Sequence, residues 1–248
     1  MNQVTLSKMK IMRFYGMHDA LKIAIETGKT DHYTLDQFIA QLIEAEWDDR
    51  ENRRINRNIK NARFRYKASI ENVIYNQERN LDQTKIMRLA QGEFIDRGEN
   101  ILITGSTGVG KSYISTALGH QACIEGYRVM YYSTNKLFAR LKMAKQEGEY
   151  LKEITKLERQ SLLILDDFGL QAMDNQSRLM LLEIIEDRHG KGSVIISSQL
   201  PVSGWYDIIG EKTIADAIMD RLLHKTYRIE LGGESMRRKK ATVITQKK

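Results

Sequence analysis

A glycine-rich segment at residues 105–112, GSTGVGKS, has the residue types and spacing needed to hold a triphosphate. It fits the pattern G-x-x-x-x-G-K-[ST] and stands between an apolar run, ILIT at 101–104, and a helical pattern. Glycines let backbone N–H groups wrap around phosphates at a helix N-terminus, whose dipole favours anions. Lys111 is expected to reach the β and γ phosphates of ATP, and Ser112 to coordinate Mg²⁺. The predicted nucleotide-binding residues are Gly105, Ser106, Thr107, Gly108, Val109, Gly110, Lys111, Ser112 and Tyr113.

Two acids end a second apolar run, SLLILDDFG at 161–169. Asp166 is expected to hold Mg²⁺ through water, and Asp167 to orient or deprotonate the attacking water. A solvated turn is the alternative, which the phosphate-binding segment upstream disfavours. The carboxylate of Asp167 reaches one methylene less far than that of a glutamate, so we expect slow hydrolysis.

A third run, SVIISSQLP at 193–201, ends in polar residues before Pro201. Ser198 or Gln199 could sense the γ phosphate from between the glycine-rich segment and the acids. A strand-terminal Ser or Gln is as often a local cap. The sequence leaves open which of the two is the sensor, and Ser198 is included among the candidate catalytic residues.

Positive charge is concentrated in residues 50–67, RENRRINRNIKNARFRYK, here called the basic segment. It has eight Lys or Arg and one acid, Glu51, and the rest of the chain has 31 basic and 31 acidic residues. This concentration suggests a polyanionic partner. Ile55, Ile59, Ala62 and Tyr66 also form a narrow apolar stripe, so a solvated helix face is the alternative. The candidate DNA-binding residues are Arg50, Arg53, Arg54, Arg57, Lys60, Arg63, Arg65 and Lys67.

The composition fits a folded protein of 248 residues, 42% of them hydrophobic. Cys123 is the single cysteine, so the sequence offers neither an internal disulfide nor a zinc-site spacing. No apolar run is long enough to span a bilayer or serve as a signal peptide. These features favour a cytoplasmic protein without a membrane partner.

The periodicity changes along the chain. Residues 5–75 have a helical pattern, including TLDQFIAQLIEAEW, where Thr34 and Gln37 form a capping box. After Asn100, the apolar runs ILIT, VMYYS, LLILD, SVIISS and YRIEL alternate with helical patterns, which indicates an α/β fold with a parallel sheet. We expect a helical N-terminal DNA-binding domain at 1–80 and an ATPase domain at 81–248.

The motifs GSTGVGKS, LLILDDFGL, VIISSQLP, TIADAIMDRL and GESMRRKK occur in this order. With them the chain resembles the AAA+ ATPases and, more closely, the IstB helper ATPases encoded by insertion sequences beside their transposase. These are relatives of the DnaC-type helicase loaders. The resemblance covers nearly the full length and implies a P-loop core with a five-stranded parallel sheet between helices, after a small all-α domain.

The resemblance also implies residue roles. Arg221 of MDRL is an expected arginine finger, inserted into the ATP site of a neighbouring subunit, where it would neutralise transition-state charge. A surface arginine paired with Asp216 or Asp220 is the alternative. Seventeen residues follow Leu231, which implies no helical C-terminal lid, and Arg237 is a candidate replacement for the lid arginine.

The segment at 134–160 is predicted to be helical and basic, with Lys136, Arg140, Lys142 and Lys145. In the initiator and loader clade, the corresponding insert reshapes the subunit interface or lies against DNA. A solvated helix face is the alternative.

The leading hypothesis is an ATPase that multimerises through its ATP sites on double-stranded DNA and assists a transposase. A replicative helicase loader is the nearest alternative, a nucleotide switch without useful turnover is another, and a small-molecule kinase is disfavoured.

Overall fold

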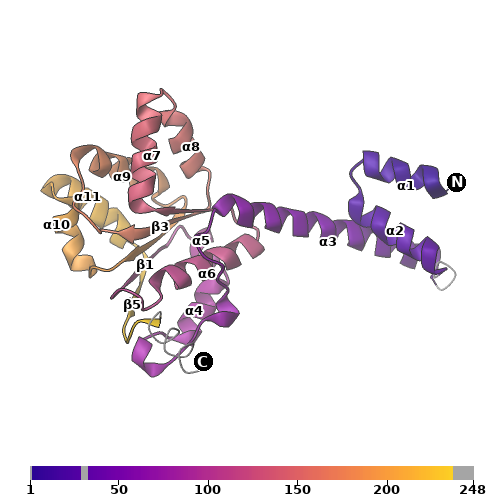
Figure 1. The fold of residues 1–248 in the computed structure, drawn as a ribbon, viewed down its shortest axis with the longest axis horizontal. Coiled ribbons are helices and arrows are strands. Elements are labelled where there is room, and N and C mark those ends of the chain that lie inside the picture. Colours follow the sequence, from indigo (N-terminus) through magenta and orange to yellow (C-terminus); the bar gives the residue numbers. More distant parts are fainter. Residues whose placement is uncertain (1, 29–32, 237–248) are drawn as a thin grey trace, which may run out of the picture. The chain divides into compact units, whose positions relative to one another are not determined.

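The computed structural model describes residues 2–28 and 33–236, which divide into two compact units, Met1–Arg57 and Asn58–Lys248. Figure 1 shows the order of the elements along the chain. None of the helices in the described ranges combines the length and apolar character required to cross a membrane.

The N-terminal unit is helical, as predicted. Helices α1 (Asn2–Ile11) and α2 (Tyr15–Thr27) precede α3 (Leu35–Ala62), which carries most of the basic segment and continues into the second unit. The predicted capping box is confirmed, because the Thr34 N–H donates to Gln37 Oε1 at 3.0 Å and the Gln37 N–H to Thr34 Oγ1 at 3.3 Å.

Helices α2 and α3 approach closely where Gly16 meets the backbone of Ala45, since a Cβ at Gly16 would lie 2.1 Å from the Ala45 carbonyl oxygen. The buried Glu46 carboxylate accepts hydrogen bonds from Arg50 Nε at 2.7 Å and from the Met17 N–H at 3.3 Å. Burial alone would raise the pKa of Glu46, but these hydrogen bonds hold it below its ordinary value. Glu46 therefore ties the two helices together as a carboxylate.

One apolar stripe of α3 faces solvent within the single chain. Leu35, Ile39, Ile43 and Trp47 recur every fourth residue and are all exposed. The apolar periodicity that predicted this helix therefore does not correspond to a fully buried face.

Within the described residues, five parallel strands form one sheet in the order β2-β3-β4-β1-β5. All five predicted strands are confirmed, as β1 (Asn100–Gly105), β2 (Val129–Ser133), β3 (Leu162–Phe168), β4 (Ser193–Ser198) and β5 (Thr226–Leu231). The other elements are η2 (Ile70–Asn72), η3 (Gln77–Arg79), α4 (Gln83–Ala90), α5 (Glu93–Asp96), α6 (Lys111–Ile124), α7 (Thr134–Gln146), α8 (Tyr150–Glu158), α9 (Asn175–Arg188), η4 (Val202–Gly204), α10 (Trp205–Ile209) and α11 (Lys212–Leu223).

Alternating side chains of the sheet bury into two separate cores. In β1, Ile101 and Ile103 belong to the core formed with α4, α5 and α6, whereas Leu102 belongs to the core formed with α7 to α11. In β3, Ile164 and Leu165 divide in the same way. Helices thus cover both faces (Figure 1), which explains why the strands read as continuous apolar runs.

The second unit begins earlier in the chain than the boundary expected near residue 80. Ala62, Ala68, Ile70 and Val73 are buried in the same core as α6, and the Asn58 side-chain amide donates to the carbonyl oxygen of Tyr127 at 3.2 Å. Burial of these residues against the sheet domain is what joins the end of α3 to it.

Arg188, at the end of α9, is 3% exposed. Its guanidinium donates to four backbone carbonyl oxygens, of Leu157, Gln160, Ser161 and Ser193, at 2.8–3.2 Å. Burial lowers the pKa of Arg188 to about 10. This side chain therefore joins α8, α9 and the beginnings of β3 and β4.

We expect Arg188→Met to lower the free energy of unfolding by about 3 kcal/mol, because it leaves several buried carbonyl oxygens without donors. The free energy of unfolding of Arg188→Lys should lie between those of the wild type and Arg188→Met, since one ammonium cannot reproduce the planar fork of donors of a guanidinium. Urea denaturation followed by circular dichroism measures both. Arg159→Met, at an exposed arginine, is the control and should stay within about 0.5 kcal/mol of the wild type. An unchanged midpoint for Arg188→Met would contradict this role.

Candidate nucleotide site

The phosphate loop, residues 105–112, joins β1 to α6, as the sequence predicts. Gly105 has a φ of 146°, and a Cβ there would lie 2.3 Å from the Leu231 carbonyl oxygen, so no other residue fits without moving β5. The Lys111 ammonium lies over the loop and donates to the carbonyl oxygens of Gly105 at 2.8 Å and Ser106 at 2.9 Å. The loop has the geometry of a backbone cradle for an anion, with a lysine above it.

Asp166, at the carboxyl end of β3, is 1% exposed and receives hydroxyl donors from three elements. Ser112 Oγ donates to Oδ1 at 3.0 Å, and Ser197 Oγ and the Tyr131 hydroxyl also donate to the carboxylate. Burial and the adjoining Asp166 raise the pKa of Tyr131 well above its ordinary range, so this hydroxyl stays protonated. Sequence reasoning missed Ser197 and Tyr131, although each ends or nears the end of a predicted strand.

The residues at this point fit Mg²⁺. The Ser112 hydroxyl and the Asp166 carboxylate are hard oxygen donors in contact with each other, and Mg²⁺ usually takes one or two protein oxygens together with phosphates and waters. No group of three or more His, Cys, Asp or Glu with metal-binding geometry occurs among the described residues. An ion here would therefore depend on the nucleotide for most of its ligands.

Asp167 stands out by its backbone, with a φ of 56° in the left-handed region. The pairing of β3 with β4 shifts register between Leu165 and Phe168, so Asp167 lies at a bulge. Its carboxylate lines the nucleotide pocket and accepts a hydrogen bond from Arg65 Nη1 at 3.0 Å. Asp167 is thus placed to contact an attacking water, but it already has a cationic partner.

Of the two sensor candidates, Gln199 rather than Ser198 faces the pocket. Ser198 is fully buried, and its hydroxyl donates to the Phe168 carbonyl oxygen at 2.8 Å and accepts from the Leu200 N–H at 3.1 Å. Gln199 lines the pocket, where its Oε1 accepts from Thr107 Oγ1 at 2.8 Å. The geometry makes Ser198 a local cap and Gln199 the sensor candidate.

The remaining pocket wall comes from the segment before β1, the first turn of α6 and the segment after β5. Ile74, Arg79, Tyr113 and Met236 are among its lining residues. Arg79, which sequence reasoning missed, is buried and donates to the Val109 carbonyl oxygen at 2.8 Å, so it braces the phosphate loop from outside. Burial lowers the pKa of its guanidinium below the ordinary value. Tyr75, which precedes Arg79 by four residues, packs against the core.

The segment after β5 reaches the phosphate loop. The Met236 N–H donates to the Gly108 carbonyl oxygen at 2.9 Å, and a Cβ at Gly108 would lie 2.2 Å from Ser235 Oγ. The GESM part of the GESMRRKK motif therefore belongs to the nucleotide site. Arg237, the candidate replacement for a lid arginine, lies outside the described residues.

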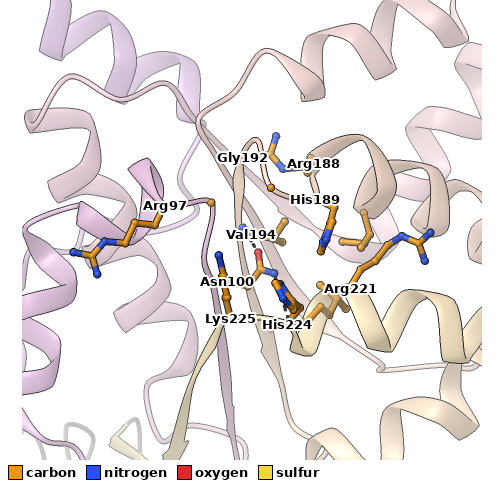
Figure 2. A pocket seen from close by; sticks show the side chains of 13 residues that line it. Arg97, Asn100, Arg188, His189, Gly192, Val194, Arg221, His224 and Lys225 are labelled. Carbon is orange, nitrogen blue, oxygen red and sulfur yellow. Dashed lines mark hydrogen bonds between the residues drawn. The ribbon is translucent and has the colours of Figure 1, made fainter.

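Arg221, the expected arginine finger, lies at the opposite edge of the sheet. It lines a pocket with Asn100 and Val194, which stand at the amino ends of β1 and β4 (Figure 2). The guanidinium points away from these two residues in Figure 2. Its Nη2 pairs with Glu186 at 2.9 Å and its Nη1 donates to the Ala217 carbonyl oxygen, so the partner is neither Asp216 nor Asp220.

The candidate DNA-binding residues fall into three groups. Arg50 and Arg53 pair with Glu46, Arg53 also pairs with Asp49, and Arg54 pairs with Glu51. Arg65 and Lys67 line the nucleotide pocket. The other three, Arg57, Lys60 and Arg63, are exposed, and no carboxylate of the described chain pairs with them or with Lys67.

The basic helical segment at 134–160 is confirmed as helical, as α7 and α8 with a break at Gly148. Arg140 makes a bidentate pair with Glu153 at 2.7 and 2.9 Å, and Lys142 pairs with Asp174 at 2.5 Å. Of the four basic side chains named above, Arg140 and Lys142 thus pair with carboxylates.

The family of the chain follows from its similarity to known proteins. The family described as IstB-like ATP binding protein matches residues 7–243. An insertion sequence ATP-binding protein of Sinorhizobium fredii is 44% identical over 234 residues, which cover 94% of this chain and 96% of that protein.

Two solved structures share the fold. The DnaC helicase loader has a TM-score of 0.56 at 20% identity, over 66% of this chain and 96% of that one. AMPPCP-bound DnaA from Aquifex aeolicus has a TM-score of 0.60 at 18% identity, over 75% of this chain and 57% of that one. The family that the sequence motifs suggested is confirmed: the chain belongs to the IstB-like ATP-binding proteins of insertion sequences and is an AAA+ ATPase.

Proposed function

We propose that this protein multimerises on double-stranded DNA in an ATP-dependent manner and assists the transposase of an insertion sequence in target selection and strand transfer. Family membership supports the link to insertion sequences. A cytoplasmic location, where ATP and chromosomal DNA meet, is part of the proposal.

Within one protomer, the chemistry is phosphoryl transfer to water. The N–H groups of the phosphate loop and the Lys111 ammonium bind the phosphates. Ser112 and Asp166 would hold Mg²⁺, which would supply positive charge to neutralise the phosphates. Asp167 orients the attacking water by accepting a hydrogen bond from it, and Gln199 contacts the γ phosphate.

The placement of Arg221 carries the proposal. Arg221 lies near the amino end of β1, and the phosphate loop follows its carboxyl end. The six residues of β1 span about 20 Å. Because that exceeds the reach of an arginine side chain, Arg221 cannot complete the ATP site of its own protomer. As an arginine finger, Arg221 therefore acts on the ATP site of a neighbouring protomer, so ATP hydrolysis depends on assembly.

Duplex DNA is the proposed polyanion for the basic segment. Arg57, Lys60 and Arg63 are exposed and without paired carboxylates in the described chain, which leaves them available for phosphates. Contacts of this kind give little sequence preference and a strong dependence on salt.

The fold likeness to the DnaC helicase loader favours one alternative, a replicative helicase loader. Such a protein would share the ATPase core but use its N-terminal unit to hold a helicase. The two functions differ in whether the basic segment contacts DNA or a protein.

The ATP-site proposal is tested by Lys111→Ala and Arg221→Ala. We expect each variant alone to lose ATP-dependent multimers on duplex DNA, measured by sedimentation, and Arg221→Ala to hydrolyse ATP at least about 10³-fold more slowly while still binding it. Mixing the two should restore hydrolysis, because Lys111→Ala subunits supply a finger to intact Arg221→Ala pockets. Glu186→Gln breaks the same ion pair but keeps Arg221, so it serves as the control. Multimers formed by both single variants would refute the proposal.

The DNA proposal is tested by the double variant Arg57→Glu, Lys60→Glu. If both side chains contact phosphates, the slope of log affinity against log salt should shrink by about 2, at about 0.9 per contact. Fluorescence anisotropy of a labelled duplex measures it. Arg88→Glu with Lys212→Glu changes the charge equally at exposed sites elsewhere and should leave the slope unchanged. A helicase loader would instead keep its DNA affinity in the first variant and lose its protein partner.

A further inference from the structure

Arg65 differs from the rest of the basic segment because it lies in the nucleotide pocket. Its Nη1 donates to Asp167 Oδ2 at 3.0 Å, and its guanidinium lies 5.3 Å from the centre of the Tyr66 ring. The side chain of Arg65 is 51% exposed and that of Asp167 28%. One member of the candidate DNA-binding set thus holds the group expected to orient the attacking water.

The backbone before Arg65 is fixed by its neighbours. Helix α3 ends at Ala62, and Arg63 follows in the left-handed region with a φ of 57°. Phe64 then packs against Tyr131, with ring centres 6.4 Å apart, and a Cβ at Gly119 would come within 2.9 Å of the Phe64 ring. Only a glycine at 119 leaves room for this ring. Arg65 is therefore presented to the pocket by an anchored segment.

Tyr131 links this anchor to the metal-binding acid. The same side chain that packs against Phe64 donates its hydroxyl hydrogen bond to Asp166. The backbone of Asp166 is also held, since Thr134 Oγ1 donates to the Asp166 carbonyl oxygen at 2.9 Å. Asp166 is thus held from several sides, whereas the Asp167 carboxylate accepts its hydrogen bond from the half-exposed Arg65.

We propose that Arg65 is a positioning residue that restrains Asp167, and that DNA bound to the basic segment withdraws Arg65 and thereby accelerates hydrolysis. A guanidinium on the Asp167 carboxylate occupies an oxygen that would otherwise accept a hydrogen bond from water. Exposed ion pairs are weak, so a nearby polyanion can compete for Arg65. The exposed Arg63 and Lys60 place such a polyanion close by in sequence.

This inference rests on the proposed function, because it requires duplex DNA on the basic segment. It differs from a direct role of Arg65 in binding phosphate, which the same pocket would permit. The two roles give opposite results when Arg65 is removed: release of Asp167 raises the rate, whereas loss of a phosphate contact weakens ATP binding and lowers the rate.

The first experiment measures phosphate release with and without duplex DNA for Arg65→Gln. We expect kcat without DNA to rise about threefold to fivefold, the range a weak ion pair permits, and the stimulation by DNA to fall by the same factor. Affinity for a fluorescent ATP analogue should not change. Arg65→Lys, which keeps the charge, should restore most of the low rate.

Arg97→Gln is the matched control. Arg97 pairs with Glu93 at 2.9 Å and has a side chain 54% exposed, close to the values for Arg65. The Arg97→Gln variant should leave kcat, the stimulation of hydrolysis by DNA and the affinity for ATP unchanged. A loss of hydrolysis and weaker ATP binding in Arg65→Gln would assign Arg65 to the phosphates and overturn the inference. An unchanged rate would also overturn it.

The second experiment measures DNA affinity without nucleotide. If DNA weakens the Arg65–Asp167 pair, removing that pair must strengthen DNA binding by the same factor, because coupling is reciprocal. Asp167→Asn should therefore bind duplex DNA about threefold to fivefold more tightly. Glu93→Gln removes one negative charge and frees one arginine elsewhere, so it controls for net charge and should have little effect.

The outcomes separate the two proposals. If the wild type does not bind duplex DNA, both the proposed function and the inference about Arg65 are refuted. If the wild type binds DNA but Asp167→Asn behaves like Glu93→Gln, only the inference fails.

Discussion

The buried carboxylate of Asp166 is the interaction on which the site depends. Burying a charge is costly unless hydrogen bonds compensate it. Here the donors come from β2 (Tyr131), β4 (Ser197) and the start of α6 (Ser112). Because these elements reach Asp166 from different sides, satisfying one carboxylate also aligns the phosphate loop with the carboxyl edge of the sheet. The Ser112 hydroxyl, at the end of the phosphate loop, is the one proposed to bind Mg²⁺ together with Asp166.

The other charged groups of the proposed mechanism are held less firmly. Asp167 pairs with Arg65, and Arg221 pairs with Glu186, and all four side chains are between 28% and 51% exposed. Pairs of this exposure contribute at most about 1 kcal/mol, so a bound polyanion or a neighbouring subunit can replace either partner. The site therefore combines a rigid centre at Asp166 with two exchangeable charges. That combination suits an ATPase whose rate responds to assembly.

Local sequence rules predicted the elements that depend on local causes. The phosphate loop follows from its glycines and Lys111, and the Thr34 and Gln37 capping box from a three-residue spacing. Buried strands could be read because both faces of the sheet are covered. The sequence could not decide between Ser198 and Gln199 as the sensor, because that choice depends on the bulge between Leu165 and Phe168 in the neighbouring strand. Arg79 was missed because its acceptor, the Val109 carbonyl oxygen, is distant in sequence.

The basic segment shows most clearly why composition alone does not give function. Its eight cations account for the net charge of the chain, and a single polyanion site was the simplest interpretation. In the structure, Glu46 engages Arg50 and Arg53, and the turn after Ala62 directs Arg65 to Asp167. One run of charge thus contains helix-packing residues, exposed cations and a residue of the ATP site. Since these groups adjoin along one chain, DNA bound to the exposed cations, as proposed, would act on the same backbone that presents Arg65 to Asp167.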